Sequence, residues 1–138
     1  MKPYLLDTCI LIDFSRGNPQ AGEFMQGLEQ QPLISSLVVA ELYAGIKKPK
    51  ERALVGKLVE ACCVVELTQT MAEQGGKWRA QYGPSHHVGL IDPLLAATAQ
   101  EAGAVFATLN LKHFPMLGAK TLLKPYQKVW GICGLPPQ

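Results

Sequence analysis

The stretch Tyr4-Leu5-Leu6-Asp7-Thr8 decides the fold of this chain of 138 residues. It begins with an apolar run that is too short for a helix and predicts a buried strand, and it ends abruptly at the carboxylate of Asp7. In an open α/β sheet, ligands bind outside the carboxyl ends of the strands, at the point where the strand order reverses. We therefore expect Asp7 to lie at a functional site rather than in the core.

Two further acidic residues have equally apolar neighbours. Glu41 lies within SLVVAEL at residues 36–42, and Asp92 lies within GLIDPLL at residues 89–95. A carboxylate in aliphatic surroundings is costly unless a cation or hydrogen bonds compensate for its burial. The three acids together favour a shared hard cation with oxygen ligands, which means Mg²⁺ or Mn²⁺.

Each acid also has a simpler structural explanation. Asp7 is suited to cap a helix that begins directly after the first strand, and Asp92 precedes a proline, a pair that is common at helix starts. Glu41 falls within a predicted helix that has no Lys or Arg at i±3 or i±4. A structural partner for it would have to come from elsewhere in the fold, such as Arg79 or Lys112. These alternatives stay open at the level of the sequence.

Short apolar runs alternate with helical patterns along the chain. Besides the first strand, strands are expected at residues 33–35, 62–67, 104–108 and 121–123. Helices are expected at residues 8–14, 19–30, 36–46, 51–61 and 93–101, and after a capping box that begins at Thr70. Residues 83–87 are expected to form a loop. This alternation is typical of a parallel sheet covered on both faces, so the expected fold class is a three-layer α/β/α domain.

The composition is that of one modest domain, expected to span residues 1–138. The net charge of +2 is mildly basic, without the concentrated patch of a dedicated nucleic-acid-binding protein. Apolar runs are too short to span a bilayer and no signal peptide is recognisable, so we expect a cytoplasmic protein without membrane contact. The four cysteines have no C-x-x-C spacing, which favours free thiols over a zinc site.

Four blocks of the sequence carry a family resemblance. They are LLDT at residues 5–8, ISSLVVAELYAGI at 34–46, IDPLLAATA at 91–99 and ATLNLKHF at 107–114. In this order they closely resemble the PIN domain, and among its members the VapC-like ribonuclease toxins of type II toxin–antitoxin systems. The resemblance implies a PIN core at about residues 4–123, with a C-terminal extension at 124–138. It also implies a five-stranded parallel sheet with strand order 3-2-1-4-5, in which Asp7, Glu41 and Asp92 meet around Mg²⁺ or Mn²⁺.

The resemblance also suggests supporting roles for other residues. The family commonly has a fourth acid where this chain has Asn110, whose amide oxygen can still ligate a cation or hold a water, and the number of metal ions stays open. Thr8 and Ser35 are expected to hydrogen-bond the metal ligands, and Thr108 and Asn110 to orient the substrate or a water. Four basic residues are candidates for contacts with RNA phosphates, with a solvated surface as the alternative: Lys47, Lys48, Arg79 and Lys112.

The implied activity is a Mg²⁺- or Mn²⁺-dependent endoribonuclease, the toxin of a toxin–antitoxin module. Metal-activated water would attack the phosphorus in line and leave a 5′-phosphate and a 3′-hydroxyl. The expected partners are RNA, a cognate antitoxin protein and a second copy of the chain. Exposed apolar residues on the first two helices and around Tyr43 would suit contacts with the antitoxin and with a second copy of the chain.

The sequence also suggests two alternatives to this activity. A catalytically weak or inactive PIN module that binds RNA or protein is the main alternative. A cysteine-phosphatase loop is excluded, because six residues separate Cys9 from Arg16 where that chemistry needs five. The first three residues after Cys9 are also bulky aliphatics, Ile10, Leu11 and Ile12, rather than the glycines that would bring backbone amides to a phosphate.

Overall fold

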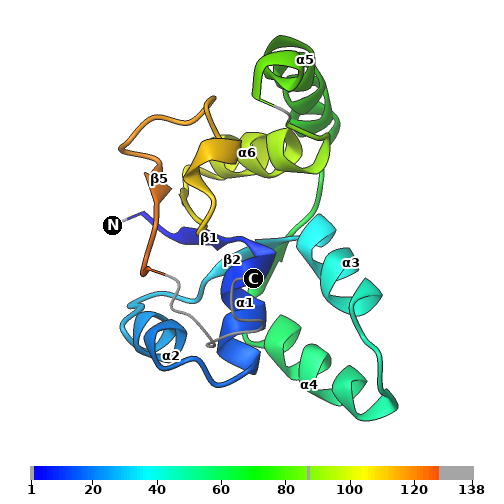
Figure 1. Cartoon of the computed structure of the whole chain (residues 1–138), viewed down its shortest axis with the longest axis vertical. Coiled ribbons are helices and arrows are strands. Elements are labelled where there is room, and N and C mark those ends of the chain that lie inside the picture. Colours follow the sequence, from blue (N-terminus) through cyan, green and yellow to red (C-terminus); the bar gives the residue numbers. More distant parts are fainter. Residues whose placement is uncertain (1, 87, 128–138) are drawn as a thin grey trace, which may run out of the picture.

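The computed structural model describes residues 2–86 and 88–127 and shows a three-layer α/β fold (Figure 1). Five strands form one parallel sheet in the order β3-β2-β1-β4-β5. The strands are β1 (Tyr4–Leu6), β2 (Leu33–Ser35), β3 (Cys63–Val65), β4 (Val105–Ala107) and β5 (Leu122–Leu123). The fold class, the parallel sheet and the strand order all confirm the sequence prediction.

Helices cover both faces of this sheet. They are α1 (Thr8–Ser15), α2 (Pro19–Gln26), α3 (Ser36–Ala44), α4 (Pro49–Glu60), α5 (Gln69–His86), α6 (Ile91–Ala102) and the short 3₁₀ helix η1 (Leu111–His113). In Figure 1, α5 and α6 lie above the sheet and α1, α2 and α4 lie below it. None of the described helices is both long and apolar enough to cross a membrane.

The core lies between the sheet and these helices. Its fully buried side chains include Leu5 on β1, Ile34 on β2 and Phe106 on β4, packed with Leu95 from α6. The inner strands β1, β2 and β4 contribute only a few residues each and are largely buried, which makes them almost wholly apolar. This explains why polar site residues fall just beyond the strand ends, as Asp7 does after β1.

Three helix starts differ from the prediction, and one of them is that of α6, which begins at Ile91 rather than at residue 93. Helix α5 does not begin with a capping box at Thr70, because the Oγ1 of Thr68 accepts the backbone N–H of Met71 at 3.1 Å and caps the first turn. Helix α4 begins at Pro49 rather than at residue 51. Proline suits the first helical position, where its missing N–H would have had no helical partner.

The predicted loop at residues 83–87 is wrong, because α5 continues to His86 with Pro84 inside it. Proline removes one helical hydrogen bond, and this loss falls in the last turn, where the cost to the helix is smallest. Gly75, earlier in α5, permits close packing on α6. A Cβ at this position would lie 2.5 Å from Leu94 Cδ2 and 3.1 Å from Leu94 Cα. This contact supports the start of α6, which carries Asp92.

Tyr126 anchors the chain after β5 to α1. Its hydroxyl donates a hydrogen bond of 2.7 Å to Oδ2 of Asp13, whose side chain is almost completely buried. The ring packs against Ile10 and Ala21. Of the predicted C-terminal extension, residues 124–127 are described, and residues 128–138 lie outside the described part of the chain. The described start of the extension is therefore fixed to the domain.

Candidate active site

Asp7 lies in the turn between β1 and α1. Its Oδ1 accepts the backbone N–H of Thr8 at 2.8 Å and so caps α1, as the simpler explanation predicted. Its Oδ2 accepts the hydroxyl of Thr108 at 2.7 Å. Thr108 follows β4 and is fully buried, and the pairing of Leu6 with Ala107 brings the two strand ends together. Asp7 therefore caps a helix and also belongs to a polar cluster at the carboxyl edge of the sheet.

Glu41 lies on the exposed side of α3, and the expectation that its apolar neighbours bury it is wrong. Those neighbours occupy the other side of the helix, which faces the core. Its Oε1 accepts the hydroxyl of Thr8 at 2.6 Å. Its partner within the described residues is thus the residue next to Asp7, rather than Arg79 or Lys112. This contact brings Glu41 to the cluster.

Asp92 lies in the first turn of α6, but it is not the N-cap. The helix begins at Ile91, the cap is Leu90, and no side chain among the described residues hydrogen-bonds the helix start. The Oδ2 of Asp92 instead lies 3.3 Å from Nδ1 of His113 on η1, and 28% of the Asp92 side chain is exposed. The structure therefore does not support a capping role for Asp92.

The three carboxylates act on one another electrostatically. Burial raises the pKa of Asp7 above its ordinary value, and the charge of Glu41 adds to this rise, while hydrogen bonds from Thr108 and Thr8 oppose it. Burial also raises the pKa of Asp92. The charges of Asp7 and Glu41 raise it further, and His113 lowers it. The charge of Glu41 therefore acts on Asp7, and the charges of both act on Asp92, whereas a metal site shared by the three acids stays a prediction.

Asn110 and Ser35 have different surroundings. The backbone N–H of Asn110 donates to the hydroxyl of Thr108 at 3.1 Å, which places this residue beside the partner of Asp7. Ser35 is fully buried, and its hydroxyl accepts the backbone N–H of Leu37 at 3.0 Å. The described hydrogen bond of Ser35 therefore serves the start of α3, and its contact with a metal ligand stays a prediction.

Three of the four basic residues that were predicted to contact RNA make no described contact with Asp7, Glu41 or Asp92. Lys47 and Lys48 are exposed before α4, where their backbone N–H groups donate to Oε1 of Glu51 at 3.3 and 2.9 Å. The guanidinium of Arg79 lies over Gly83 on α5, so closely that a side chain at residue 83 would collide with it. For these residues, contact with RNA stays a prediction.

The fourth basic candidate, Lys112, lines an open cavity of about 450 Å³. The cavity is formed by Leu109, Asn110, Leu111, Lys112, His113 and Lys124. Neither His113 nor Lys124 was among the predicted site residues. His113 could have been found from its place in the ATLNLKHF block, whereas nothing near Lys124 in the sequence points to a site.

Cys9, close to Asp7, does not offer a thiolate. Burial and the neighbouring Asp7 carboxylate raise the pKa of Cys9 to about 11, so the thiol is protonated at neutral pH. Cys9, Cys62 and Cys63 are free cysteines, and Cys133 lies outside the described residues. Nucleophilic catalysis by Cys9 is therefore unfavourable, in agreement with the exclusion of a cysteine phosphatase.

The donor atoms of the site fit a hard divalent cation. They are carboxylate and hydroxyl oxygens, and a bound cation would compensate the cost of ionising Asp7 and Asp92, whose pKa values are raised chiefly by burial. Within residues 2–86 and 88–127, no three His, Cys, Asp or Glu side chains are already grouped as ligands of one ion. The described side-chain contacts of Glu41 and Asp92 each involve one carboxylate oxygen, whereas both oxygens of Asp7 accept hydrogen bonds.

Comparison with known proteins identifies the family. Residues 4–115 match the family model of the PIN domain. This chain belongs to the PIN domain family. Ribonuclease VapC19 of Mycobacterium tuberculosis is 34% identical to this PIN protein, over 81% of the chain and 92% of its own length. Ribonuclease VapC10 of the same species is 36% identical, over 81% of the chain and 86% of its own length.

A solved structure has the same fold as this PIN protein. A toxin–antitoxin complex from Klebsiella pneumoniae contains a chain that superposes with a TM-score of 0.78 at 26% identity. The match covers 91% of this chain and 99% of that one. Together with the two VapC relatives, it confirms the family predicted from the four sequence blocks.

Proposed function

We propose that this PIN protein is a divalent-metal-dependent endoribonuclease and the toxin of a toxin–antitoxin pair. The proposal is supported by the arrangement at the carboxyl edge of the sheet, where Thr8 hydrogen-bonds both Asp7 and Glu41 and where the charges of these two acids raise the pKa of Asp92. The relatives named as VapC ribonucleases support RNA as the substrate class.

The three acids would hold Mg²⁺ or Mn²⁺. When bound, such a cation supplies positive charge that polarises the scissile phosphorus and lowers the pKa of a water. Thr108 orients the carboxylate of Asp7 and Thr8 orients that of Glu41, so both acids are positioned before the substrate arrives. Exposed Glu41 is suited to orient the attacking water and to accept its proton. In-line attack would displace the 3′ oxygen and leave a 5′-phosphate and a 3′-hydroxyl.

Incubation of the purified protein with structured and single-stranded RNAs tests this proposal. We expect cleavage with Mg²⁺ or Mn²⁺ and none with EDTA, because the acids alone supply no compensating positive charge. Degradation of the products by an exonuclease that requires a 5′-phosphate would show the 5′-phosphate. RNA binding that is indifferent to metal, without cleavage of any RNA, would instead favour the non-catalytic binding module.

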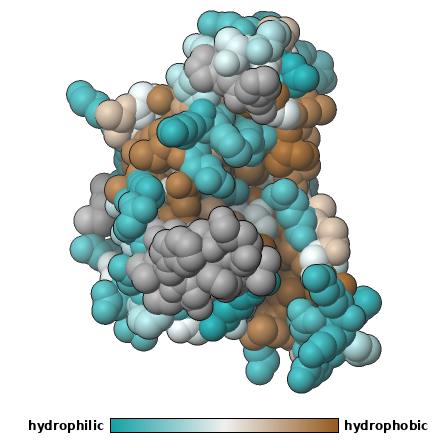
Figure 2. Space-filling view, viewed as in Figure 1, coloured by the Kyte–Doolittle hydropathy of each residue, from teal (hydrophilic) through white to brown (hydrophobic). Residues whose placement is uncertain are grey.

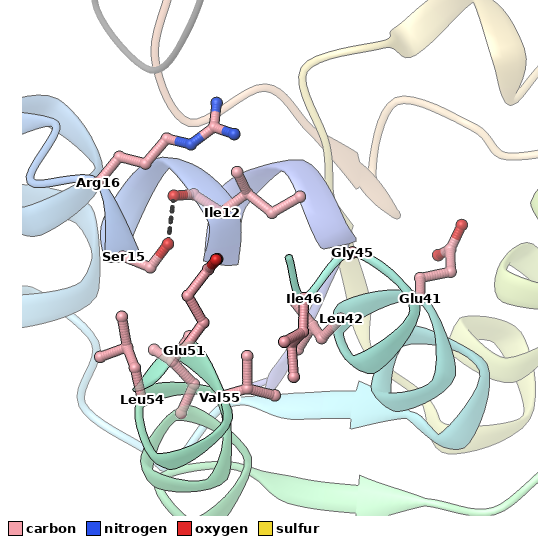
Figure 3. A pocket seen from close by; sticks show the side chains of 11 residues that line it. Ile12, Ser15, Arg16, Glu41, Leu42, Gly45, Ile46, Glu51, Leu54 and Val55 are labelled. Carbon is pink, nitrogen blue, oxygen red and sulfur yellow. Dashed lines mark hydrogen bonds between the residues drawn. The ribbon is translucent and has the colours of Figure 1, made fainter. Parts of the chain in front are cut away.

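We propose that a segment of the antitoxin occupies a groove between α1, α3 and α4 (Figure 3). The groove has a volume of about 110 Å³ and is lined by Ile12, Ser15, Arg16, Glu41, Leu42, Gly45, Ile46, Glu51, Leu54, Val55 and Leu58. In Figure 3, Glu51 points from α4 toward α1, and Glu41 lies at the opposite end. Hydrophobic side chains also gather beside α4 in the space-filling view (Figure 2). An apolar segment with a basic residue would complement this lining and would reach the candidate active site at Glu41.

Substitution of Leu54 tests the groove. Leu54 is 45% exposed in the unbound protein, so Leu54→Asp should leave the fold intact yet bury a charge in the complex, and we expect affinity to fall at least about tenfold. Calorimetry with the product of the neighbouring gene would measure this change. Val64→Asp, at an exposed apolar residue outside the groove, is the matched control. Equal affinity of wild type and Leu54→Asp would place the antitoxin elsewhere. The homodimer stays a prediction.

A further inference from the structure

The open cavity beside the acids has the size and the lining of a ligand site. Its volume of about 450 Å³ lies within the range of roughly 300–1,000 Å³ that is usual for small-molecule sites. Apolar side chains, Leu109 and Leu111, form part of the wall, and Leu111 is 40% exposed. Two lysines from separate segments complete it: Lys112 comes from η1, and Lys124 follows β5. Apolar surface flanked by two positive charges suits a nucleobase with its neighbouring phosphates.

The cavity is directly connected to the candidate active site. His113 lines it and also contacts Asp92, with 3.3 Å between Nδ1 and Oδ2. Asn110 lines it as well, and its backbone N–H donates to Thr108, whose hydroxyl donates to Asp7. A nucleotide in this cavity would therefore lie next to the phosphate that the three acids address.

Lys124 is held in place by its neighbours on both sides. The backbone N–H of Thr108 donates to the carbonyl oxygen of Leu123 at 3.0 Å, which ties this segment to the end of β4. Two residues after Lys124, the buried Tyr126 donates its hydrogen bond to Asp13. The backbone that carries Lys124 is thus fixed at the cavity, and only the side chain has to adjust to a ligand.

We propose that this cavity binds one unpaired nucleotide of the substrate strand, adjacent to the bond that is cleaved. Lys112 and Lys124 would contact the two phosphates that flank this nucleotide, and Leu109 and Leu111 would contact its base. This proposal rests on the proposed ribonuclease function. A base inside a duplex is stacked and paired and cannot enter such a cavity, so the substrate is single-stranded at this position.

The salt dependence of RNA binding tests the proposal. A labelled single-stranded RNA of random sequence is titrated with protein in EDTA, so that binding is measured without cleavage. Each phosphate contact in single-stranded RNA contributes about 0.7 to the slope of log K against log salt, so the double variant Lys112→Ala/Lys124→Ala should lose about 1.4. The control is Lys57→Ala/Lys77→Ala, which removes two exposed lysines that do not line the cavity. It should keep the wild-type slope.

Each other outcome has a defined meaning. A wild-type slope in the cavity variant, together with metal-dependent cleavage by the wild type, would overturn the cavity proposal and leave the nuclease intact. An equal loss in the control pair would also overturn it, because the effect would then be one of total charge. If the cavity variant shows the same loss of slope with double-stranded RNA as with single-stranded RNA, the requirement for an unpaired nucleotide would be overturned. If the wild type neither binds nor cleaves any RNA, the proposed function itself fails.

Discussion

Asp92→Asn is expected to reduce RNA cleavage at least about 100-fold while leaving the domain folded. Loss of residues that only support metal ligands costs about 10–100-fold in affinity or activity, so loss of a proposed direct ligand should cost at least the upper value. The fold should tolerate the change because Asp92 does not cap α6 and because asparagine can still contact His113. Initial cleavage rates with Mg²⁺, measured beside thermal unfolding, would show both effects.

Glu101→Gln is the matched control for this experiment. Glu101 is an exposed acid on the same helix, and it accepts the hydroxyl of Thr68 at 3.0 Å. The same removal of charge there should leave cleavage within about twofold of wild type, because surface substitutions away from such a site have small effects. Full activity of Asp92→Asn would show that Asp92 is not needed for catalysis. Only Asp7 and Glu41 would then remain as candidate metal ligands.

The sequence predicted the fold class well because buried strands appear in it as short apolar runs. A run such as Leu5-Leu6, covered on both faces, cannot be exposed, and the helices between such runs force parallel connections. The errors lie at helix ends. Helix α5 begins at Gln69 with Thr68 as its cap, and it continues through Pro84. Both Thr68 and Thr70 are suitable caps in the sequence, so the local pattern does not decide between neighbouring helix starts.

The sequence singled out Asp7, Glu41 and Asp92 because carboxylates are uncommon among aliphatic residues. For Glu41, however, aliphatic neighbours in the sequence do not mean burial in the structure. Its neighbours face the core while the acid itself is exposed, so composition alone overstated its burial. The contact between Asp92 and His113 joins α6 to η1, and Lys124 reaches the site from beyond β5. Such contacts depend on where elements pack, which the spacing of residues along the chain does not reveal.

Without metal, the stability of the protein is expected to fall as the pH rises above about 4 and through the raised folded pKa values of two acids. An Asp in the unfolded chain titrates near about 3.9, and the folded pKa values of Asp7 and Asp92 are raised above this. The folded state therefore binds more protons than the unfolded state in this window, and stability is lost as the pH rises through the folded pKa values. Asp7→Asn and Asp92→Asn should each flatten the dependence, whereas Glu101→Gln should not. Thermal unfolding across this pH range measures the effect.

Addition of Mg²⁺ should reverse this loss, because a cation binds the ionised carboxylates and competes with their protons. At a concentration 100 times the dissociation constant, the gain would be about 2.7 kcal/mol, or roughly 9 °C for a domain of this size. The gain should be larger at about pH 8 than at about pH 5, since the acids are more fully ionised there. It should also shrink in Asp7→Asn. If the pH dependence is present but Mg²⁺ and Mn²⁺ give no stabilisation at either pH, the acids repel one another without forming a cation site. The non-catalytic binding module would then be the better account of the protein.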